Sequence, residues 1–354
     1  MSSSDGYYIK ILNNAIVYIY RYGNPIVYIL GNIGNLLSAV VFMRKAWKKN
    51  VCVFYFLISL VLSSIYLNST ILGTALINGF NINAQNSSVI LCKLLFYAAF
   101  LSSTLLPTVL ILASIDRLLI SSQNVETRLH SSKRLAYFSI SVSTFFWIIF
   151  NIHVLIKVNL QEIVPSQYVC YYDQSNFYVD FVSYFLMIFN TLVCLAIIIL
   201  SVIAFKNIRH IRIFPHHQRN QIRSMTIKDF QLLRCLFVQD IVYITVSIFS
   251  SVFSIYTATT RNQRTTSLQQ AIHDFLDNFF VFLYFIFYCV NFFIFLIISK
   301  VFRHELKRMI YKIFGKNLRE IRDEDNKQET MKDDHRQSNI VVVNSISNAS
   351  IINK

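Results

Sequence analysis

Charged residues next to apolar stretches are the side chains of this sequence that could do chemistry. Asp116 and Arg117 are adjacent at the end of one apolar run, and Asp240 lies in the middle of another. A charge pair is tolerable at a membrane-helix end, where the two charges partly neutralise each other, and its alternative is an arginine that merely snorkels to the interface. Asp240 is a functional candidate, and its alternative is a protonated carboxylic acid bonded to a neighbouring helix.

Metal-binding chemistry has one weak signal. His304-Glu305 could begin a His-Glu-x-x-His zinc motif, but Arg308 stands where the second histidine must be. No other cluster of metal-ligating residues is evident in the sequence. We therefore expect no metal, no cofactor and no enzyme activity.

The composition is typical of a membrane protein. Of the 354 residues, 55% are hydrophobic and 14% are charged, and the mean hydropathy is +0.48. Soluble domains carry about a quarter charged residues, so an ordinary soluble enzyme, a disordered chain and a fibrous protein are all excluded. On so apolar a chain, the net charge of +15 indicates cytosolic loops at a lipid bilayer rather than a nucleic-acid partner.

Seven long intervals lack lysine and arginine, the residues that are costliest to place in hydrocarbon. Each contains an apolar run of roughly 18–25 residues, which is enough to cross about 30 Å of hydrocarbon as a helix. Phe279–Phe287 is apolar all round, unlike a helix of a soluble all-α core. We predict an all-α membrane protein, a seven-transmembrane helix bundle, with helices at 24–43, 52–77, 92–119, 135–156, 178–205, 232–257 and 275–299.

Basic residues concentrate after the first expected helix, between the fifth and sixth, and after the seventh. The positive-inside rule then predicts an extracellular N-terminus and a cytoplasmic C-terminus, although Arg261 and Arg264 in the last outer loop weaken the pattern. Asn86 begins a glycosylation sequon in a loop expected outside. The predicted parts are an extracellular segment 1–23, the membrane domain 24–299, a short amphipathic eighth helix 300–314 and a disordered cytoplasmic tail 315–354.

Short motifs recur in a fixed order along the seven expected helices. They are Gly34-Asn35 in the first helix, Cys92 and Asp116-Arg117-Leu118 at the two ends of the third, Trp147 in the fourth, Asn291-Phe292-Phe293-Ile294-Phe295 in the seventh, and Phe302 after it. In order and spacing the chain resembles the rhodopsin-like G-protein-coupled receptors, most of all the neuropeptide receptors, from residue 24 to about 314. Asn35, Trp147 and Phe302 are then structural positions.

The resemblance implies a receptor of the plasma membrane that passes an extracellular signal to a heterotrimeric G protein, with arrestin as a further partner. Asp116, Arg117, Asn291 and Phe295 would form the coupling switch, with the arginine held by the aspartate until activation. It also implies a disulfide between Cys92 and Cys170, which would pin the second outer loop over the bundle. Two free thiols are the alternative.

The chain departs from the family pattern at several helix positions. Ser63 stands where the family has a sodium-binding aspartate, or Ser64 does if the alignment slips by one residue, which puts sodium modulation in doubt. The family prolines of helices five, six and seven are absent, and Leu118 replaces a tyrosine. Some of the kinking is expected at Pro107 in helix three instead.

The resemblance also places an outer ligand pocket. Ala99 occupies the position at which amine receptors carry an aspartate, so a monoamine ligand is not expected. The rim is acidic and aromatic and suits a peptide with basic and aromatic side chains, although ordinary helix-end polarity is the alternative. The expected pocket walls are Ala99, Phe100, Ser103, Ser250, Ser251, Ser254, Asp277 and Val281.

Two other classes of protein remain as alternatives. A receptor-shaped scaffold that no longer signals is favoured by the lost prolines and by Leu118. A transporter or channel is less favoured, because only Asp240 lies deep and no pair of Gly/Pro-broken helices marks duplicated halves.

Overall fold

The computed structural model describes residues 3–45, 47, 50–121, 131–164, 167–173, 176–213, 227–260 and 266–313. Within this part of the chain, seven helices are long and apolar enough to cross a membrane, as the sequence predicted. They lie at Asp5–Phe42, Val51–Gly79, Val89–Ile120, Lys133–Lys157, Phe177–Ala204, Asp229–Phe253 and Ser267–Cys289. The protein therefore has the architecture of a multi-pass helical membrane protein.

The first helix begins well before residue 24, where the sequence analysis placed its start. It runs through α1 (Ser3–Tyr18), a wide π-helical turn η1 (Ile19–Gly23) and α2 (Asn24–Phe42). The segment 1–23 is thus largely helical rather than a separate extension of the membrane helix. Pro25 lacks an N–H donor, and a proline is tolerated at the start of a helical segment such as α2, directly after the wide turn.

The second helix is also interrupted by wide turns. It consists of α3 (Val51–Tyr66), η2 (Leu67–Ile71), α4 (Leu72–Thr74) and η3 (Ala75–Gly79). Its last turn approaches η1 so closely that a Cβ atom on Gly79 would lie 2.9 Å from the Cα atom of Arg21. The Arg21 Nε atom donates a hydrogen bond to the Gly79 carbonyl, 2.9 Å away. Glycine is therefore required at this contact between the first two helices.

The remaining membrane helices match the predicted ranges with longer ends. The third is α5 (Val89–Ser121), which contains Pro107, and a short 3₁₀ turn η4 (Ala84–Ser87) precedes it. The fourth is α7 (Lys133–Phe150) followed by α8 (Ile152–Lys157). The fifth is α9 (Asn176–Ile213) and the sixth is α10 (Ile227–Thr260). The seventh consists of α11 (Ser267–Cys289) and α12 (Asn291–Ile298) and is interrupted at Val290, although it contains no proline.

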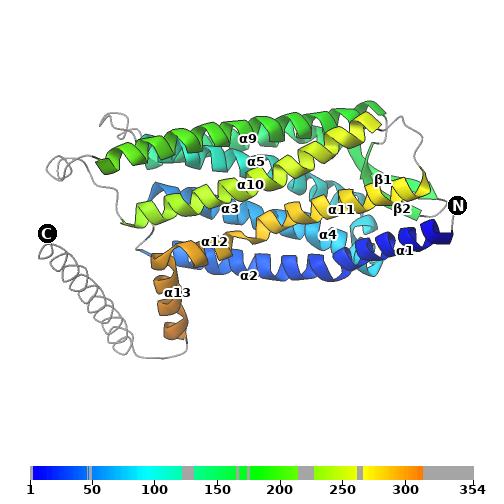
Figure 1. Ribbon diagram of the computed structural model, residues 1–354, viewed down its shortest axis with the longest axis horizontal. Helices are drawn as coiled ribbons and strands as arrows, with labels where there is room; N and C mark the ends of the chain where they lie inside the picture. Colours follow the sequence, from blue (N-terminus) through cyan, green and yellow to red (C-terminus); the bar gives the residue numbers. More distant parts are fainter. Residues whose placement is uncertain are drawn as a thin grey trace, which may run out of the picture. The chain divides into compact units, whose positions relative to one another are not determined.

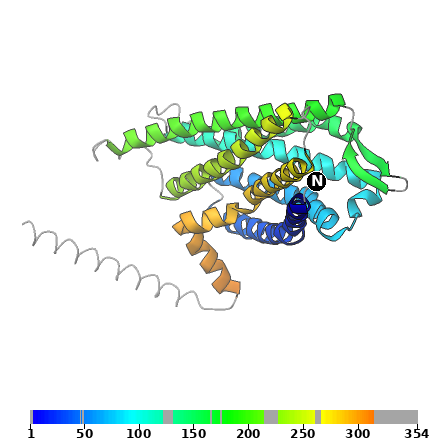
Figure 2. The same ribbon diagram turned by 45° about the vertical axis from the view of Figure 1, so that its right-hand side comes forward.

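The helices of residues 3–300 lie side by side and alternate in direction, so their ends form two groups (Figures 1 and 2). One group surrounds the antiparallel hairpin of β1 (Val158–Val164) and β2 (Gln167–Tyr172), and we call it the disulfide end. The other contains the last turns of α5 and the first turns of α3 and α10, and we call it the arginine end. Between them α5 packs against α3, α7 and α9, and α10 packs against α9 and α11.

Residues 301–354 form a second unit, of which the described part is helix α13 (Lys300–Ile313). Its apolar residues recur at helical spacing, and basic residues occupy the intervening positions. This pattern matches the amphipathic helix predicted at 300–314. The tail predicted to be disordered, 315–354, lies outside the described residues, and so do Arg261 and Arg264.

Candidate functional site

The candidate site lies at the arginine end, where a cation is completely buried. The side chain of Arg117 is 1% exposed, so it does not snorkel. Its Nη2 atom donates to Asp116 Oδ2 at 2.6 Å and its Nε atom donates to the same oxygen at 3.2 Å. Asp116 Oδ1 accepts from the Ser131 hydroxyl at 2.6 Å. Both oxygens of Asp116 are thus engaged, and the adjacent acid holds the guanidinium in a defined place.

A second acid reaches the same guanidinium from another helix. Asp229, in the first turn of α10, has its Oδ1 atom 4.0 Å from Nη1 of Arg117. A helix N-terminus favours a carboxylate at this position. The Asn50 side chain also donates to Asp229 Oδ1, while Asn50 Oδ1 caps α3 by accepting from the Cys52 amide at 2.9 Å. The arginine end is therefore tied together by polar contacts among α3, α5 and α10, which we call the arginine latch: Asn50, Asp116, Arg117 and Asp229.

The sequence analysis did not assign Asp229 or Asn50 to the site. Asp229 carried a local signal, since it is an acid in the first turn of a helix, but no sequence spacing relates it to Arg117. Asn50 carried the signal of an N-cap residue before an apolar run. Their contact with the latch depends on how the helices pack.

A second polar chain crosses the bundle at Asn291, one of the predicted switch residues. Gln239 on α10 donates to Asn291 Oδ1 at 2.7 Å, and Asn291 Nδ2 donates to the Ser63 hydroxyl at 3.3 Å. All three side chains are buried. Asn35, on α2, donates to the Tyr288 carbonyl and the Ser64 hydroxyl, at 3.5 Å each. The two candidates for the missing aspartate position, Ser63 and Ser64, therefore each accept a hydrogen bond from a neighbouring helix.

Phe295, the last predicted switch residue, lies in an aromatic cluster. Its ring centroid is 4.9 Å from that of Phe42 and 5.0 Å from that of Phe56, both nearly edge-to-face. Trp47 extends the cluster at 5.5 Å from Phe42. Since Phe295 has no hydroxyl group, its contribution here is packing of α12 against α2 and α3.

The predicted structural tryptophan, Trp147, connects α7 to α5. Its Nε1 atom donates to the Thr108 hydroxyl at 3.0 Å, and the rings of Phe150 and Phe189 pack edge-to-face on it. Phe302 lies on α13 and is buried.

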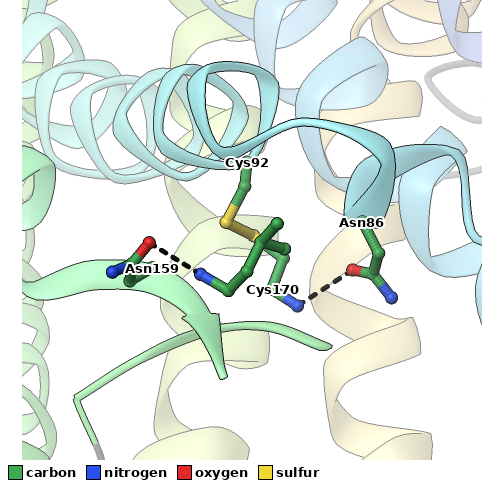
Figure 3. The surroundings of a disulfide bond; sticks show 5 residues. Asn86, Cys92, Asn159 and Cys170 are labelled. Atoms are coloured by element: carbon green, nitrogen blue, oxygen red, sulfur yellow. Dashed lines mark hydrogen bonds between the residues drawn. A yellow bond between two sulfur atoms is a disulfide. The ribbon is translucent and has the colours of Figure 1, made fainter. Parts of the chain in front are cut away.

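The disulfide end contains the bridge that the resemblance implied, Cys92–Cys170 (Figure 3). It joins the first turns of α5 to strand β2. The Asn86 side-chain oxygen accepts a hydrogen bond from the Cys170 amide at 2.9 Å. Val154 and Val158 are buried around the bridge. The hairpin is therefore fixed to the top of α5 by a covalent bond, a hydrogen bond and apolar packing.

The eight predicted pocket residues do not line a common cavity among those of the described part of the chain. Phe100 packs against the disulfide cluster, and the Ser103 hydroxyl donates to the carbonyl of Phe100 on its own helix at 2.9 Å. Asp277 and Val281 are exposed. Ala99, Ser250 and Ser251 are partly buried, and Ser254 lies on α10.

A polar cavity of about 510 Å³ lies elsewhere at the disulfide end, between the first, second and seventh helices. The Tyr20 hydroxyl donates to Asn278 Oδ1 at its wall. Uncharged amide groups of this kind match the hydrogen-bonding groups of a peptide backbone. Its lining residues, which the sequence analysis did not single out, are Ile16, Tyr20, Ile77, Asn78, Asn81, Asn83 and Asn278.

No protein-family model matches this chain, and no curated protein matches it either. The functional argument therefore rests on the residues and on the geometry described above.

Proposed function

We propose that this chain is a divergent rhodopsin-like G-protein-coupled receptor of the plasma membrane, which transmits an extracellular signal to heterotrimeric G proteins. The observation that carries the proposal is the arginine latch. A fully buried guanidinium is held by Asp116 on its own helix and reaches Asp229 on α10. Such a contact between two membrane helices can exist in one arrangement and be lost in another, which is what a two-state switch requires.

A peptide is the class of ligand that the disulfide end favours. The asparagine-rich cavity offers several hydrogen-bond donors and acceptors without a fixed charge. The hairpin β1–β2 borders the same end with an aromatic and acidic strand segment, Tyr171–Asp173. Together these surfaces suit an extended chain with amide groups and basic or aromatic side chains.

The second candidate is a receptor-like scaffold that does not signal. It is favoured by α10, which runs from Ile227 to Thr260 without a proline. A kink in this helix would give a natural hinge, and its absence weakens the expected movement. The interruption of the seventh helix at Val290 and Pro107 within α5 favour the signalling receptor instead.

The latch can be tested without knowledge of the ligand. Asp229→Asn should raise basal nucleotide exchange on G proteins in membranes that contain the full chain, because it weakens a contact of the resting arrangement. If this contact differs by about 1.4 kcal/mol between the two states, the population ratio shifts roughly tenfold. Asp274→Asn, which neutralises an exposed acid on α11, is the matched control and should leave exchange unchanged. Equal exchange for all three proteins at equal surface levels would favour the scaffold.

Topology is a separate expected result. An epitope inserted at Ser3 should be stained on intact cells, and an epitope at Ser350 only after permeabilisation, because the basic connecting segments are retained in the cytosol. Flow cytometry on both tagged forms measures this. The reverse staining would contradict the receptor proposal, since the arginine latch would then face away from any G protein.

A further inference from the structure

A second cavity, of about 570 Å³, lies beside the latch where α5, α9 and α10 meet. Its walls are mainly apolar and include Leu200, Ala204 and Leu236. One acid lines it, Asp240, which is 3% exposed. The proposed receptor mechanism makes no use of this acid.

Asp240 has only one of its oxygens hydrogen-bonded. The hydroxyls of Ser114 on α5 and Ser201 on α9 both donate to Oδ2, at 3.2 and 3.3 Å. Oδ1 is buried and has no hydrogen-bond partner within the described part of the chain. A buried carboxylate oxygen without a donor is costly, so a site that keeps one is expected to receive a donor from outside the protein.

The charges around the cavity favour a cationic donor. Arg117 and Arg234 are the lining cations, and Arg117 is already paired with Asp116 and Asp229. The Arg234 guanidinium lies over the ring of Phe230, 4.8 Å from its centroid. With Asp240 ionised, these two arginines and three acids leave one negative charge in excess. A single positive charge beside Asp240 would neutralise the site.

The size and walls of the cavity indicate what carries this charge. Cavities of about 300–1,000 Å³ are typical of small-molecule sites and are far larger than a metal ion needs. We propose that the cavity binds an amphiphilic organic cation, whose ammonium group donates to Asp240 Oδ1 and whose apolar body lies against Leu200, Ala204 and Leu236. The inference does not depend on signalling, because it concerns binding alone.

Thermal unfolding of the full chain in detergent tests the proposal. Cys52, Cys194, Cys235 and Cys289 are free and buried, so a thiol-reactive fluorophore reports their exposure on heating. The probe is phenylbutylamine, and phenylbutanol is its neutral counterpart. We expect the amine to raise the unfolding temperature and the alcohol to do so much less, because only the ammonium pairs with the acid. An equal effect of the two compounds would overturn the proposal.

Three variants locate the amine. Asp240→Asn should weaken its apparent affinity at least about tenfold, since a charge-assisted hydrogen bond is lost. Ala204→Phe fills the cavity but keeps the acid, and it should abolish the difference between amine and alcohol. Asp274→Asn, on the outer part of α11, should behave as the wild type. An amine effect that survives both Asp240→Asn and Ala204→Phe would place the amine elsewhere and overturn the proposal. Stabilisation by sodium chloride alone that is lost in Asp240→Asn would overturn it in favour of a metal ion.

Discussion

Replacing Arg117 by alanine in the Asp229→Asn protein should return nucleotide exchange to the level of membranes that lack the chain. Asp229→Asn is expected to populate the active arrangement, and Arg117 is the cation that this arrangement releases toward the G protein under the proposal. With the guanidinium gone, the released end of α5 has no charge-assisted donor to offer. The measurement is basal exchange in membranes matched for surface expression of the two proteins.

Folding must be separated from signalling in this experiment, because Arg117→Ala leaves Asp116 buried without its cation. The double change Asp116→Asn with Arg117→Ala removes both charges and should restore surface expression while exchange stays absent. Arg117→Lys keeps the charge but cannot donate from both Nε and Nη2 to one oxygen, so we expect intermediate exchange. Undiminished exchange in Arg117→Ala would show that the latch is not the switch.

Loss of the disulfide is the second large effect that we expect. Cys92→Ser and Cys170→Ser should each sharply reduce the fraction of the chain at the cell surface. The bridge closes a segment with a sequence separation of 78 residues, and removal of a native disulfide typically costs about 2–5 kcal/mol. The hairpin would then be held to α5 only by packing and by the hydrogen bond from the Cys170 amide to Asn86. Surface labelling of an N-terminal epitope measures the loss.

The pairing itself is tested by combining the two changes. The double variant should be no worse than either single variant, because one bond accounts for both losses. Cys194→Ser, at a free and buried cysteine, is the matched control for the chemistry of the substitution. Additive losses would show that the two thiols act independently.

Most of the fold could be predicted from the sequence, because transfer of apolar residues from water is a local property. The seven gaps in lysine and arginine correspond to the seven long helices, and the amphipathic pattern after residue 300 corresponds to α13. The start of the first helix was missed. Residues 3–18 mix polar and apolar side chains, and packing of α1 against α11 stabilises a helix that local hydropathy does not predict.

The candidate site divides in the same way. Adjacent residues, Asp116 and Arg117, could be recognised from the sequence because their contact is local. Asp229, Gln239 and the unpaired oxygen of Asp240 could not, since their partners lie on other helices. The predicted pocket walls failed to gather in one cavity for the same reason.

The sequence by itself determined that this chain forms seven apolar helices and that a cation ends the third. Both follow from the identity of residues close together in the chain, through hydropathy and charge. Only the tertiary structure decided which acid reaches Arg117, which serines surround Asp240, and where the cavities lie. These depend on helix rotation and on close approaches such as that at Gly79, where contacts between distant residues set the geometry.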